Sequence, residues 1–396
     1  MLPLDEVVFA SAVRLPLGKF GGSLRDMRVY QLGAAVIPEA LRRAGVRPDQ
    51  VVEVFVSHNR QSGNGPNPGR TAAVLGGIPV SVPAHTINMA CPAGLMATVA
   101  AARTIRLEEA DVALVIGMES MSTIPHLLRN ARWRTFRRGD IVLEDEFFSM
   151  VDPLSQMGTV ALAERTAAKY RISRQEQERY AVESHRRAAR AWQAGWFAEE
   201  VVPIEVPPTD EREAFTFTRD ECYRPDASLD AMARLKPVLE GGTVTAATAS
   251  GVTDGAGALV MMSRSKARTL GIRPLGSLLA YAQVGVEPED MLEGPVEAIR
   301  RVLHKASMKL EDLDLIEVNE AFAGQVLANE RSLGWDQSRL NIHGGAIALG
   351  HPTGFTGVRL LITLLHALRT HSGRYGLAAI CGGGGLGVAV IVEREA

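Results

Sequence analysis

The chain contains two similar halves, and this duplication constrains its fold more than any other feature of the sequence. The segment AGVRPDQVVEVFVSH, from Ala44, matches ASMKLEDLDLIEVNE, from Ala306, at an offset of 262 residues. The segment CPAGLMATVAAARTI, from Cys91, matches HPTGFTGVRLLITLL, from His351, at an offset of 260. Two matches at nearly the same offset indicate an internal duplication rather than a short repeat.

Each half alternates strands with helices. The second matched helix of each half is followed by a short apolar strand, in DVALVIGMES from Asp111 and YGLAAICGGGG from Tyr375. This alternation predicts an α/β fold with a largely parallel, buried sheet. A chain of 396 residues also exceeds the size at which one core usually keeps growing, so two or more packed units are expected.

A region of different character separates the halves. It contains a strongly helical piece from Met157 to Glu200, then an irregular, proline-rich stretch, PIEVPPTD, from Pro203. It is too long for a simple loop, so we interpret it as an insertion that carries substrate contacts. The chain then re-enters the first half through the strand-like segment GTVTAATASGVTDGAGALVMMS. The predicted units are 1–119 with 243–270, the inserted 120–242, and 271–396.

Charge and cysteine content exclude several classes of protein. The formal net charge of −2 provides no basic field for nucleic acid or an anionic membrane. Three cysteines do not make a disulfide framework, which favours a reducing compartment. The acidic residues Asp5 and Glu6 do not fit a signal peptide, and apolar stretches such as Leu360 to Leu365 are too short to span a membrane. We therefore expect a cytoplasmic protein without nucleic-acid partners.

The duplication aligns Cys91 with His351, and a proline follows each of them. Proline suits the first turn of a helix, so both residues are expected at helix N-termini. A helix N-terminus favours negative charge and would lower the pKa of a cysteine placed there. A neighbouring imidazole would complete a nucleophile–base pair. The alternative is that Cys91 is an inert core residue, as free cysteines often are.

Glycines surround the other candidate residues. His351 lies in GGAIALGHPTGFTG, and Cys381 opens CGGGGLG. Glycines at a strand end allow a ligand to approach the backbone closely and could supply N–H groups to an oxyanion, although a tight turn or bulge remains the alternative. Cys222, in DECYRP, has no such surroundings and is interpreted as a bystander. The remaining histidines do not have the spacing of metal ligands.

Four segments carry a resemblance to a known family. NMACPAGLMA, VNEAFA, GGAIALGHPTGFTG and CGGGGLG, in this order and spacing, resemble the four signature blocks of the thiolases. The likeness extends from AVRLPLGKFGG to the terminal VAVIVE, so it covers essentially the whole chain. It implies two βαβαβαββ halves in a layered α-β-α-β-α sandwich, with a loop domain inserted in the first half.

The resemblance also implies roles for individual residues. Cys91 would be the acylated nucleophile, and His351 the base that activates it. Cys381 would move the proton at the α-carbon of the second acyl-CoA. Asn319 would hold a water that forms one oxyanion hole with His351, while the N–H groups of Cys91 and Gly383 form the other.

Substrate-binding residues are implied in the same way. Ser250 would contact the pantetheine arm of CoA, and Arg224 matches a basic residue near the adenine, although it could be a solvated arginine. Met157 and Phe322 would line the acyl pocket, or simply belong to the core. Coenzyme A is then substrate and product, with no metal and no bound organic cofactor. The family pattern is a homodimer, or a homotetramer joined through the loop domain.

The sequence departs from the family pattern at a few positions. Ala93 stands where serine is more usual, and ATAS replaces the commoner Gly-Asn-Ala-Ser before Gly251. Gln156 stands where short-chain biosynthetic members often carry histidine, and Phe355 replaces a small residue. The last two changes bear on the preferred length of the acyl chain.

The expected activity is a reversible Claisen condensation through an acyl-Cys91 intermediate. It would join two acetyl-CoA into acetoacetyl-CoA, as an acetyl-CoA C-acetyltransferase, or cleave longer 3-ketoacyl-CoA, as an acetyl-CoA C-acyltransferase. One alternative is a ketoacyl synthase, but those enzymes lack the second cysteine, Cys381. The others are a catalytically silent paralogue that binds acyl-CoA or lipid, and an unrelated cysteine hydrolase.

Overall fold

The computed structural model describes residues 5–133, 140–148 and 151–395. The outer ends of the two predicted halves, residues 1–4 and 396, lie outside the described residues, as do 134–139 and 149–150 of the predicted insertion. Within the described part of the chain, every helix is too short or too polar to cross a lipid bilayer.

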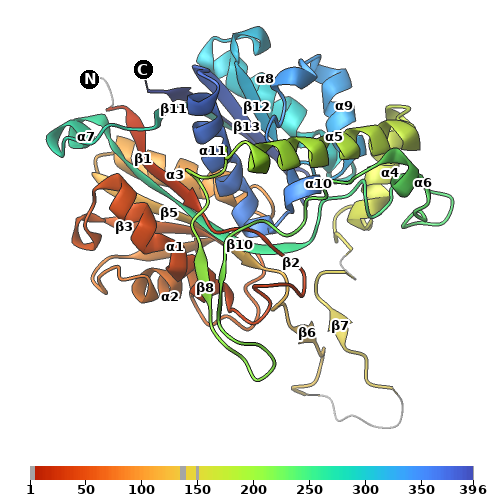
Figure 1. Cartoon of the computed structure of the whole chain (residues 1–396), viewed down its shortest axis with the longest axis horizontal. Helices are drawn as coiled ribbons and strands as arrows, with labels where there is room; N and C mark the ends of the chain where they lie inside the picture. Colours follow the sequence, from red (N-terminus) through yellow and green to blue (C-terminus); the bar gives the residue numbers. More distant parts are fainter. Residues whose placement is uncertain (1–4, 134–139, 149–150, 396) are drawn as a thin grey trace.

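One mixed sheet runs through both halves of the chain (Figure 1). Its strands are β1 (Val7–Arg14), β2 (Gly18–Lys19), β3 (Glu53–Ser57), β4 (Ala84–Ile87), β5 (Val112–Ser120), β10 (Thr253–Ser263), β11 (Gly276–Gly285), β12 (Leu315–Val318), β13 (Tyr375–Gly382) and β14 (Leu386–Arg394). Their order is β12-β13-β14-β11-β1-β10-β5-β3-β4, with β2 paired to β10.

The strand order repeats the duplication seen in the sequence. In the first half β3, β5, β10 and β1 are neighbours in that order, and β12, β13, β14 and β11 follow the same order in the second. In each half the first pair is parallel and the next two are antiparallel. The halves meet where β1 pairs with β11, through Val8 with Ser277 and Phe9 with Gly276. The predicted duplicated α/β fold is confirmed.

The prediction of a largely parallel sheet is wrong. Only β3–β4, β3–β5 and β12–β13 are parallel among the described strands. A crossover helix makes parallel neighbours, whereas β14 follows β13 directly through a tight turn at residues 383–385, which makes antiparallel ones. The expectation of a buried sheet holds, because β1, β5 and β10 are buried along their whole length.

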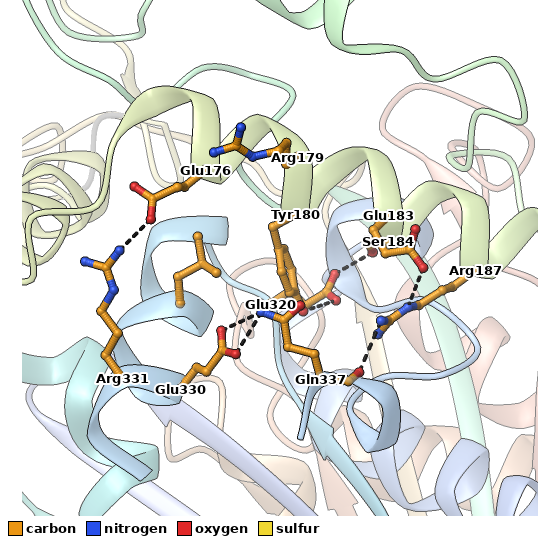
Figure 2. Close-up of a pocket in the computed structure, with 11 residues that line it drawn as sticks. Glu176, Arg179, Tyr180, Glu183, Ser184, Arg187, Glu320, Glu330, Arg331 and Gln337 are labelled. Carbon is orange, nitrogen blue, oxygen red and sulfur yellow. Dashed lines mark hydrogen bonds and ion pairs between the residues drawn. The ribbon is translucent and has the colours of Figure 1, made fainter. Parts of the chain in front are cut away.

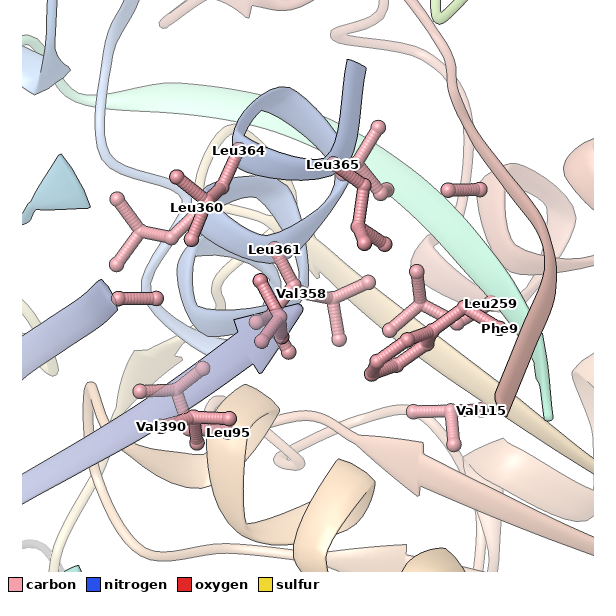
Figure 3. Close-up of a cluster of buried hydrophobic side chains, with 14 of the residues drawn as sticks. Phe9, Leu95, Val115, Leu259, Val358, Leu360, Leu361, Leu364, Leu365 and Val390 are labelled. Atoms are coloured by element: carbon pink, nitrogen blue, oxygen red, sulfur yellow. The ribbon is translucent and has the colours of Figure 1, made fainter. Parts of the chain in front are cut away.

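Helices cover both faces of each half and fill the space between the halves, which gives five layers. The outer face of the first half packs on α1, and that of the second on α8 and α9. Between them lies the central core, to which α3 and α11 contribute side chains such as Leu95 and Leu361 (Figure 3). The helices of the two halves are α1 (Val29–Ala44), α2 (Pro68–Leu75), α3 (Ala93–Arg106), α7 (Arg264–Thr269), α8 (Gly294–Ala306), α9 (Ala323–Leu333), α10 (Ala346–Leu349) and α11 (Thr353–Thr370).

The two duplicated helices, α3 and α11, touch at glycines. A Cβ on Gly94 would lie 2.5 Å from the backbone nitrogen of Val358, so only glycine allows this approach. The close crossing brings the N-termini of α3 and α11 to the same place in the molecule. Cys91 and His351 each stand two residues before one of these helices.

The inserted region leaves the sheet and forms its own small elements. The predicted helical piece is two helices, because the chain turns at Arg171, which has a positive φ of 51°, and restarts with a Ser173–Glu176 capping box. β6 and β7 form an arm that extends away from the rest of the molecule (Figure 1). The elements are β6 (His126–Leu127), β7 (Glu144–Asp145), α4 (Thr159–Lys169), α5 (Arg174–Gln193), β8 (Ile204–Val206), β9 (Phe215–Phe217) and α6 (Leu229–Ala233).

Candidate active site

Cys91 lies in the tight connection between β4 and α3. Ala90 has a positive φ of 51°, and the N–H of Ala93 donates to its carbonyl at 2.9 Å. Pro92 then precedes the first residue of α3, where its lack of an N–H removes no helical hydrogen bond. The turn leaves the thiol of Cys91 partly buried, in front of the helix.

His351 occupies the equivalent position before α11. Its N–H donates to the carbonyl of Gly251 at 2.8 Å. Its Nε2 lies 3.3 Å from Sγ of Cys91, and its Nδ1 lies 2.6 Å from Oγ1 of Thr356. The structure thus brings together the two residues that the duplication paired.

Thr356 contacts the nitrogen of His351 that lies away from the thiol. The Thr356 hydroxyl also lies 3.1 Å from the carbonyl of Pro352, and when it donates to that oxygen it accepts from Nδ1. In this arrangement Nδ1 is protonated, which leaves the lone pair on Nε2, facing the thiol. This is the tautomer that a general base requires. Sequence reasoning missed Thr356, and its position in the first turn of α11 was the available signal.

The expectation that the pKa of Cys91 is lowered is wrong. Burial raises the pKa of Cys91 to about 11, although the charge of Arg60 and the N–H groups of Cys91 and Gly383 oppose the rise. Burial also lowers the pKa of His351 to about 4. Desolvation therefore outweighs the helix terminus, and at neutral pH the pair rests as an uncharged thiol beside an uncharged imidazole.

Cys381 is the second-last residue of β13 and lies against the Cys91 turn. It is 2% exposed, and a Cβ on the next residue, Gly382, would collide with the ring of Pro92. Burial raises the pKa of the Cys381 thiol, and the neighbouring Cys91 adds to this rise. The glycines that follow make the tight turn to β14, and the first of them, Gly383, directs its N–H at the Cys91 sulfur.

Asn319 follows β12 and is completely buried. Its N–H donates to the carbonyl of Ala379 at 3.0 Å. Neither the oxygen nor the nitrogen of its side-chain amide has a hydrogen-bond partner among the described residues. A buried polar group without a partner costs about 1–3 kcal/mol, so such a group in a folded protein calls for a function or a bound water.

An apolar cluster lies on the other side of Cys381. Phe322 is buried in it and Met157 packs against it, so the structure brings both predicted acyl-pocket residues to the second cysteine. The other members are Val160, Leu162, Ala163, Val244, Ala249, Met291, Leu292 and Ala321.

The backbone at Ser250 and Gly251 makes hydrogen bonds to two of the signature blocks, VNEAFA and GGAIALGHPTGFTG. Its N–H donates to the carbonyl of Ala321 at 3.0 Å, and the next residue, Gly251, accepts from His351. Arg224 is exposed in the inserted region, where its N–H donates to Nδ1 of His185 at 3.1 Å. Cys222, interpreted as a bystander, lies nearer than expected, because a Cβ on Gly251 would be 3.6 Å from its sulfur.

Phe355 belongs to the central core and not to the cluster around Cys381. Its ring lies over three strand glycines, Gly117, Gly255 and Gly257, and a Cβ on the last would be 2.5 Å from the ring. The missing side chains on β5 and β10 therefore make room for the bulky residue after HPTG. Gln156, the other departure that bears on chain length, is exposed and has a positive φ of 56°.

A separate charged cavity of about 500 Å³ lies between α5 and α9 (Figure 2). Its wall includes Glu320, whose carboxylate accepts from Tyr180 at 2.8 Å, from Ser184 at 2.7 Å and from the N–H of Ile347 at 3.0 Å. These hydrogen bonds join the VNEAFA block, which also contains Asn319, to α10 and α5. No three His, Cys, Asp or Glu side chains in the described ranges gather into a possible metal site.

Comparisons with known proteins agree along the whole chain. Residues 7–265 match the family model "Thiolase, N-terminal domain", and residues 272–394 match "Thiolase, C-terminal domain". Acetyl-CoA acetyltransferase of Cupriavidus necator is 46% identical over 99% of this chain and 100% of its own length. Beta-ketothiolase BktB of the same species is 44% identical over 98% and 99%. Human mitochondrial 3-ketoacyl-CoA thiolase in complex with CoA superposes with a TM-score of 0.95, at 40% identity over 99% of both chains.

Proposed function

The chain belongs to the thiolase family, and from this premise we propose how its own side chains carry the reaction. It catalyses the reversible Claisen condensation of two acyl-CoA thioesters and the reverse thiolysis of a 3-ketoacyl-CoA. The observation that carries the residue assignment is the 3.3 Å contact between Nε2 of His351 and Sγ of Cys91.

We assign the first half of thiolysis to the pair and to Cys381. Nε2 of His351 takes the proton of Cys91 while the sulfur attacks the 3-keto carbon. The bond between this carbon and the α-carbon breaks, and the α-carbanion takes the proton of Cys381, so acetyl-CoA leaves and the shortened acyl group remains on Cys91. The raised pKa of Cys381 supports this role, because the thiol rests protonated and ready to donate.

The second half restores the enzyme. Free CoA gives its thiol proton to the Cys381 thiolate, and the CoA sulfur attacks the carbonyl of acyl-Cys91. The Cys91 sulfur leaves and takes back the proton held by His351. Condensation is the same sequence in reverse. Both members of the resting pair are uncharged, so the proton of Cys91 has to pass to His351 in the first attack.

Two negative oxygens develop during these steps and need preorganised donors. For the tetrahedral intermediate on Cys91 we propose the N–H groups of Cys91 and Gly383, which already face the sulfur. For the enolate of the second acyl-CoA we propose a water held by Asn319 together with His351. The unpaired, buried amide of Asn319 supports this assignment, since a water would satisfy it.

The inserted region is proposed to bind coenzyme A, which is the molecule present in the human thiolase complex. Ser250 would contact the pantetheine arm beside His351, and Arg224 would lie toward the nucleotide. Met157 and Phe322 would contact the acyl chain beside Cys381. The reaction steps proposed above use the side chains of Cys91, His351 and Cys381, backbone N–H groups, a water at Asn319 and the substrates.

We also propose that the chain acts as a homodimer or homotetramer in the cytoplasm. Apolar side chains are exposed along the β6–β7 arm, at Leu128, Ile141, Val142 and Leu143, and a second copy would cover them. All three cysteines are free thiols, which suits a reducing compartment. The native mass in solution tests the assembly, and Val142→Glu with Leu143→Glu should lower it if the arm joins copies.

Labelled acetyl-CoA tests the residue assignment. Wild type should acquire label on Cys91 and cleave 3-ketoacyl-CoA in a CoA-dependent manner, and Cys91→Ala should do neither. Cys381→Ala should acylate Cys91 at nearly the wild-type rate yet lose condensation and thiolysis by about a hundredfold or more. Equal loss of both steps in Cys381→Ala would contradict the role of Cys381, and an unlabelled Cys91 in wild type would contradict the whole assignment.

A further inference from the structure

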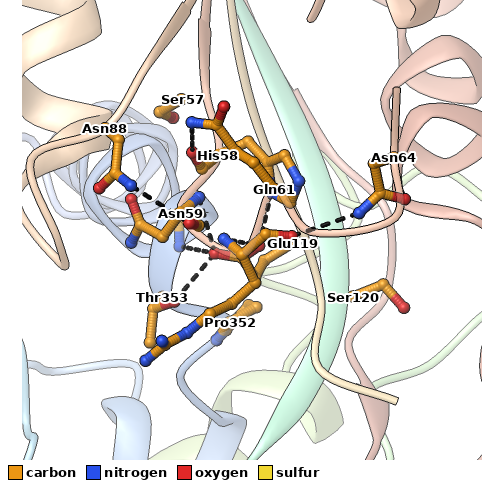
Figure 4. A network of polar contacts seen from close by, with 12 residues as sticks. Ser57, His58, Asn59, Gln61, Asn64, Asn88, Glu119, Ser120, Pro352 and Thr353 are labelled. Carbon is orange, nitrogen blue, oxygen red and sulfur yellow. Dashed lines mark hydrogen bonds and ion pairs between the residues drawn. The ribbon is translucent and has the colours of Figure 1, made fainter. Parts of the chain in front are cut away.

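The carboxylate of Glu119, near the end of β5, makes hydrogen bonds to the segments next to both His351 and Cys91 (Figure 4). It is completely buried. Its Oε2 accepts from the hydroxyl of Thr353 at 2.9 Å and from the N–H of Gly354 at 2.8 Å. Its Oε1 lies 2.6 Å from Nδ1 of His58, and the N–H of Asn59 donates to Oε2 at 3.1 Å.

On one side this carboxylate holds the helix of His351. Thr353 and Gly354 are the first two residues of α11, where backbone N–H groups have no partner within the helix. An anion from a neighbouring strand satisfies one of them and suits the positive end of the helix. His351 stands two residues earlier, so the place of its ring follows the place of this turn.

On the other side the carboxylate holds the loop that supports Cys91. Asn59 accepts, through its carbonyl, from the side chain of Asn88 at 3.2 Å. The oxygen of Asn88 in turn accepts from the N–H of Ala90 at 3.0 Å, directly before Cys91. Glu119 therefore connects the two loops whose separation sets the distance between thiol and imidazole.

Close packing fixes the position of the Glu119 carboxylate, and its hydrogen-bond partners favour its charged form. A Cβ on Gly354 would lie 2.8 Å from Oε2 and 2.8 Å from Cα of His58, so glycine is what permits this approach. Burial alone would raise the pKa of Glu119, but the imidazole of His58 and the donors from Thr353 and Gly354 hold it below its ordinary value. His58 is itself completely buried.

We propose that Glu119, held by His58, is a positioning residue of the thiolase reaction that keeps Nε2 of His351 on the sulfur of Cys91. This rests on the proposed roles of Cys91 and His351. Glu119 acts on where the imidazole lies, whereas Thr356 acts on which tautomer it adopts.

Two substitutions at Glu119 change the length and the charge of its side chain separately. Glu119→Asp keeps the charge but is too short to bond both His58 and α11, and Glu119→Gln keeps the length but removes the charge. Both should slow acylation of Cys91 by acetyl-CoA by about 10- to 100-fold, since small displacements of reacting groups carry such costs. The KM for acetyl-CoA should change little in either variant.

The pH dependence of Cys91 alkylation supplies a readout that a general loss of structure would not give. The negative charge of Glu119 raises the pKa of Cys91. Glu119→Gln should therefore move the alkylation midpoint to lower pH while acylation becomes slower, and Glu119→Asp should leave the midpoint near that of wild type. A matched control is Glu53→Gln, which removes a second His–Glu contact, 2.6 Å to His85, on β3; it should leave acylation unchanged.

Several results would overturn the proposal. These are wild-type acylation in both Glu119 variants, a loss in Glu119→Gln alone, an unmoved midpoint in Glu119→Gln, or a loss that follows only the fraction of unfolded protein. If the Glu119 variants do not fold, Thr353→Val removes one bond and should slow acylation about threefold to tenfold, and an unchanged rate would refute the proposal. A wild-type enzyme that is not acylated on Cys91 would instead refute the proposed function.

Discussion

Replacing Thr356 by valine tests how the structure sets the tautomer of His351. Valine has the shape of threonine without its hydroxyl, and the site is completely buried, so the change removes the hydrogen bonds to His351 and to the carbonyl of Pro352 but little packing. In the variant Nδ1–H of His351 loses its acceptor, the Thr356 oxygen at 2.6 Å. The imidazole can then move its proton to Nε2, and that tautomer cannot take the proton of Cys91.

The magnitude follows from the cost of the unpaired group. A buried N–H without an acceptor costs about 1–3 kcal/mol, and this cost must be met whenever the ring returns to the tautomer that acts as a base. At about 1.4 kcal/mol for each factor of ten, acylation of Cys91 should slow by about 5- to 150-fold. The affinity for acetyl-CoA should stay the same, because Thr356 supports the imidazole from behind.

Rapid-quench measurement of acyl-Cys91 gives the rate directly. Thr356→Ser keeps a hydroxyl and should stay near wild type. Thr363→Val is the matched control, because Thr363 is a buried threonine of the same helix whose hydroxyl bonds Glu200, at 3.2 Å, and not His351. The reasoning is refuted if Thr356→Val acylates at the wild-type rate, or if Thr363→Val slows acylation as much.

Two further predictions concern stability. Burial holds the pKa of His351 and His185 at about 4 and that of His343 at about 3, so these groups stay neutral when folded but take up protons near pH 6.5 when unfolded. The free energy of unfolding should therefore fall as the pH drops from 6.5 to 5, by about 1–2 kcal/mol per histidine, and a urea midpoint that is equal at pH 7 and pH 5 would contradict this. Phe355→Ala should cost about 3–5 kcal/mol by urea unfolding, because it leaves a void over Gly117, Gly255 and Gly257. It should leave the preferred acyl-chain length unchanged, and a shifted preference at unchanged stability would show that Phe355 contacts substrate.

The inserted region and the sheet show where sequence patterns reach their limit. Apolar periodicity located the helical piece of the insertion but not its interruption at Arg171. Strand–helix alternation located the buried strands but predicted a largely parallel sheet, since the hairpin from β13 to β14 leaves only a glycine run in the sequence. Periodicity reports which residues face a core, and strand direction depends on which strands meet.

The sequence by itself determined the duplicated fold and the equivalence of Cys91 and His351. Both rest on local patterns, a proline at a helix start followed by an apolar period, that each half carries independently. Only the tertiary structure decided the chemistry of that pair. Burial reverses the expected direction of the Cys91 pKa, and the first turn of α11, next to His351, bonds Glu119, which lies 234 residues from Thr353 along the chain. Desolvation and such distant contacts arise from packing, and no local segment records them.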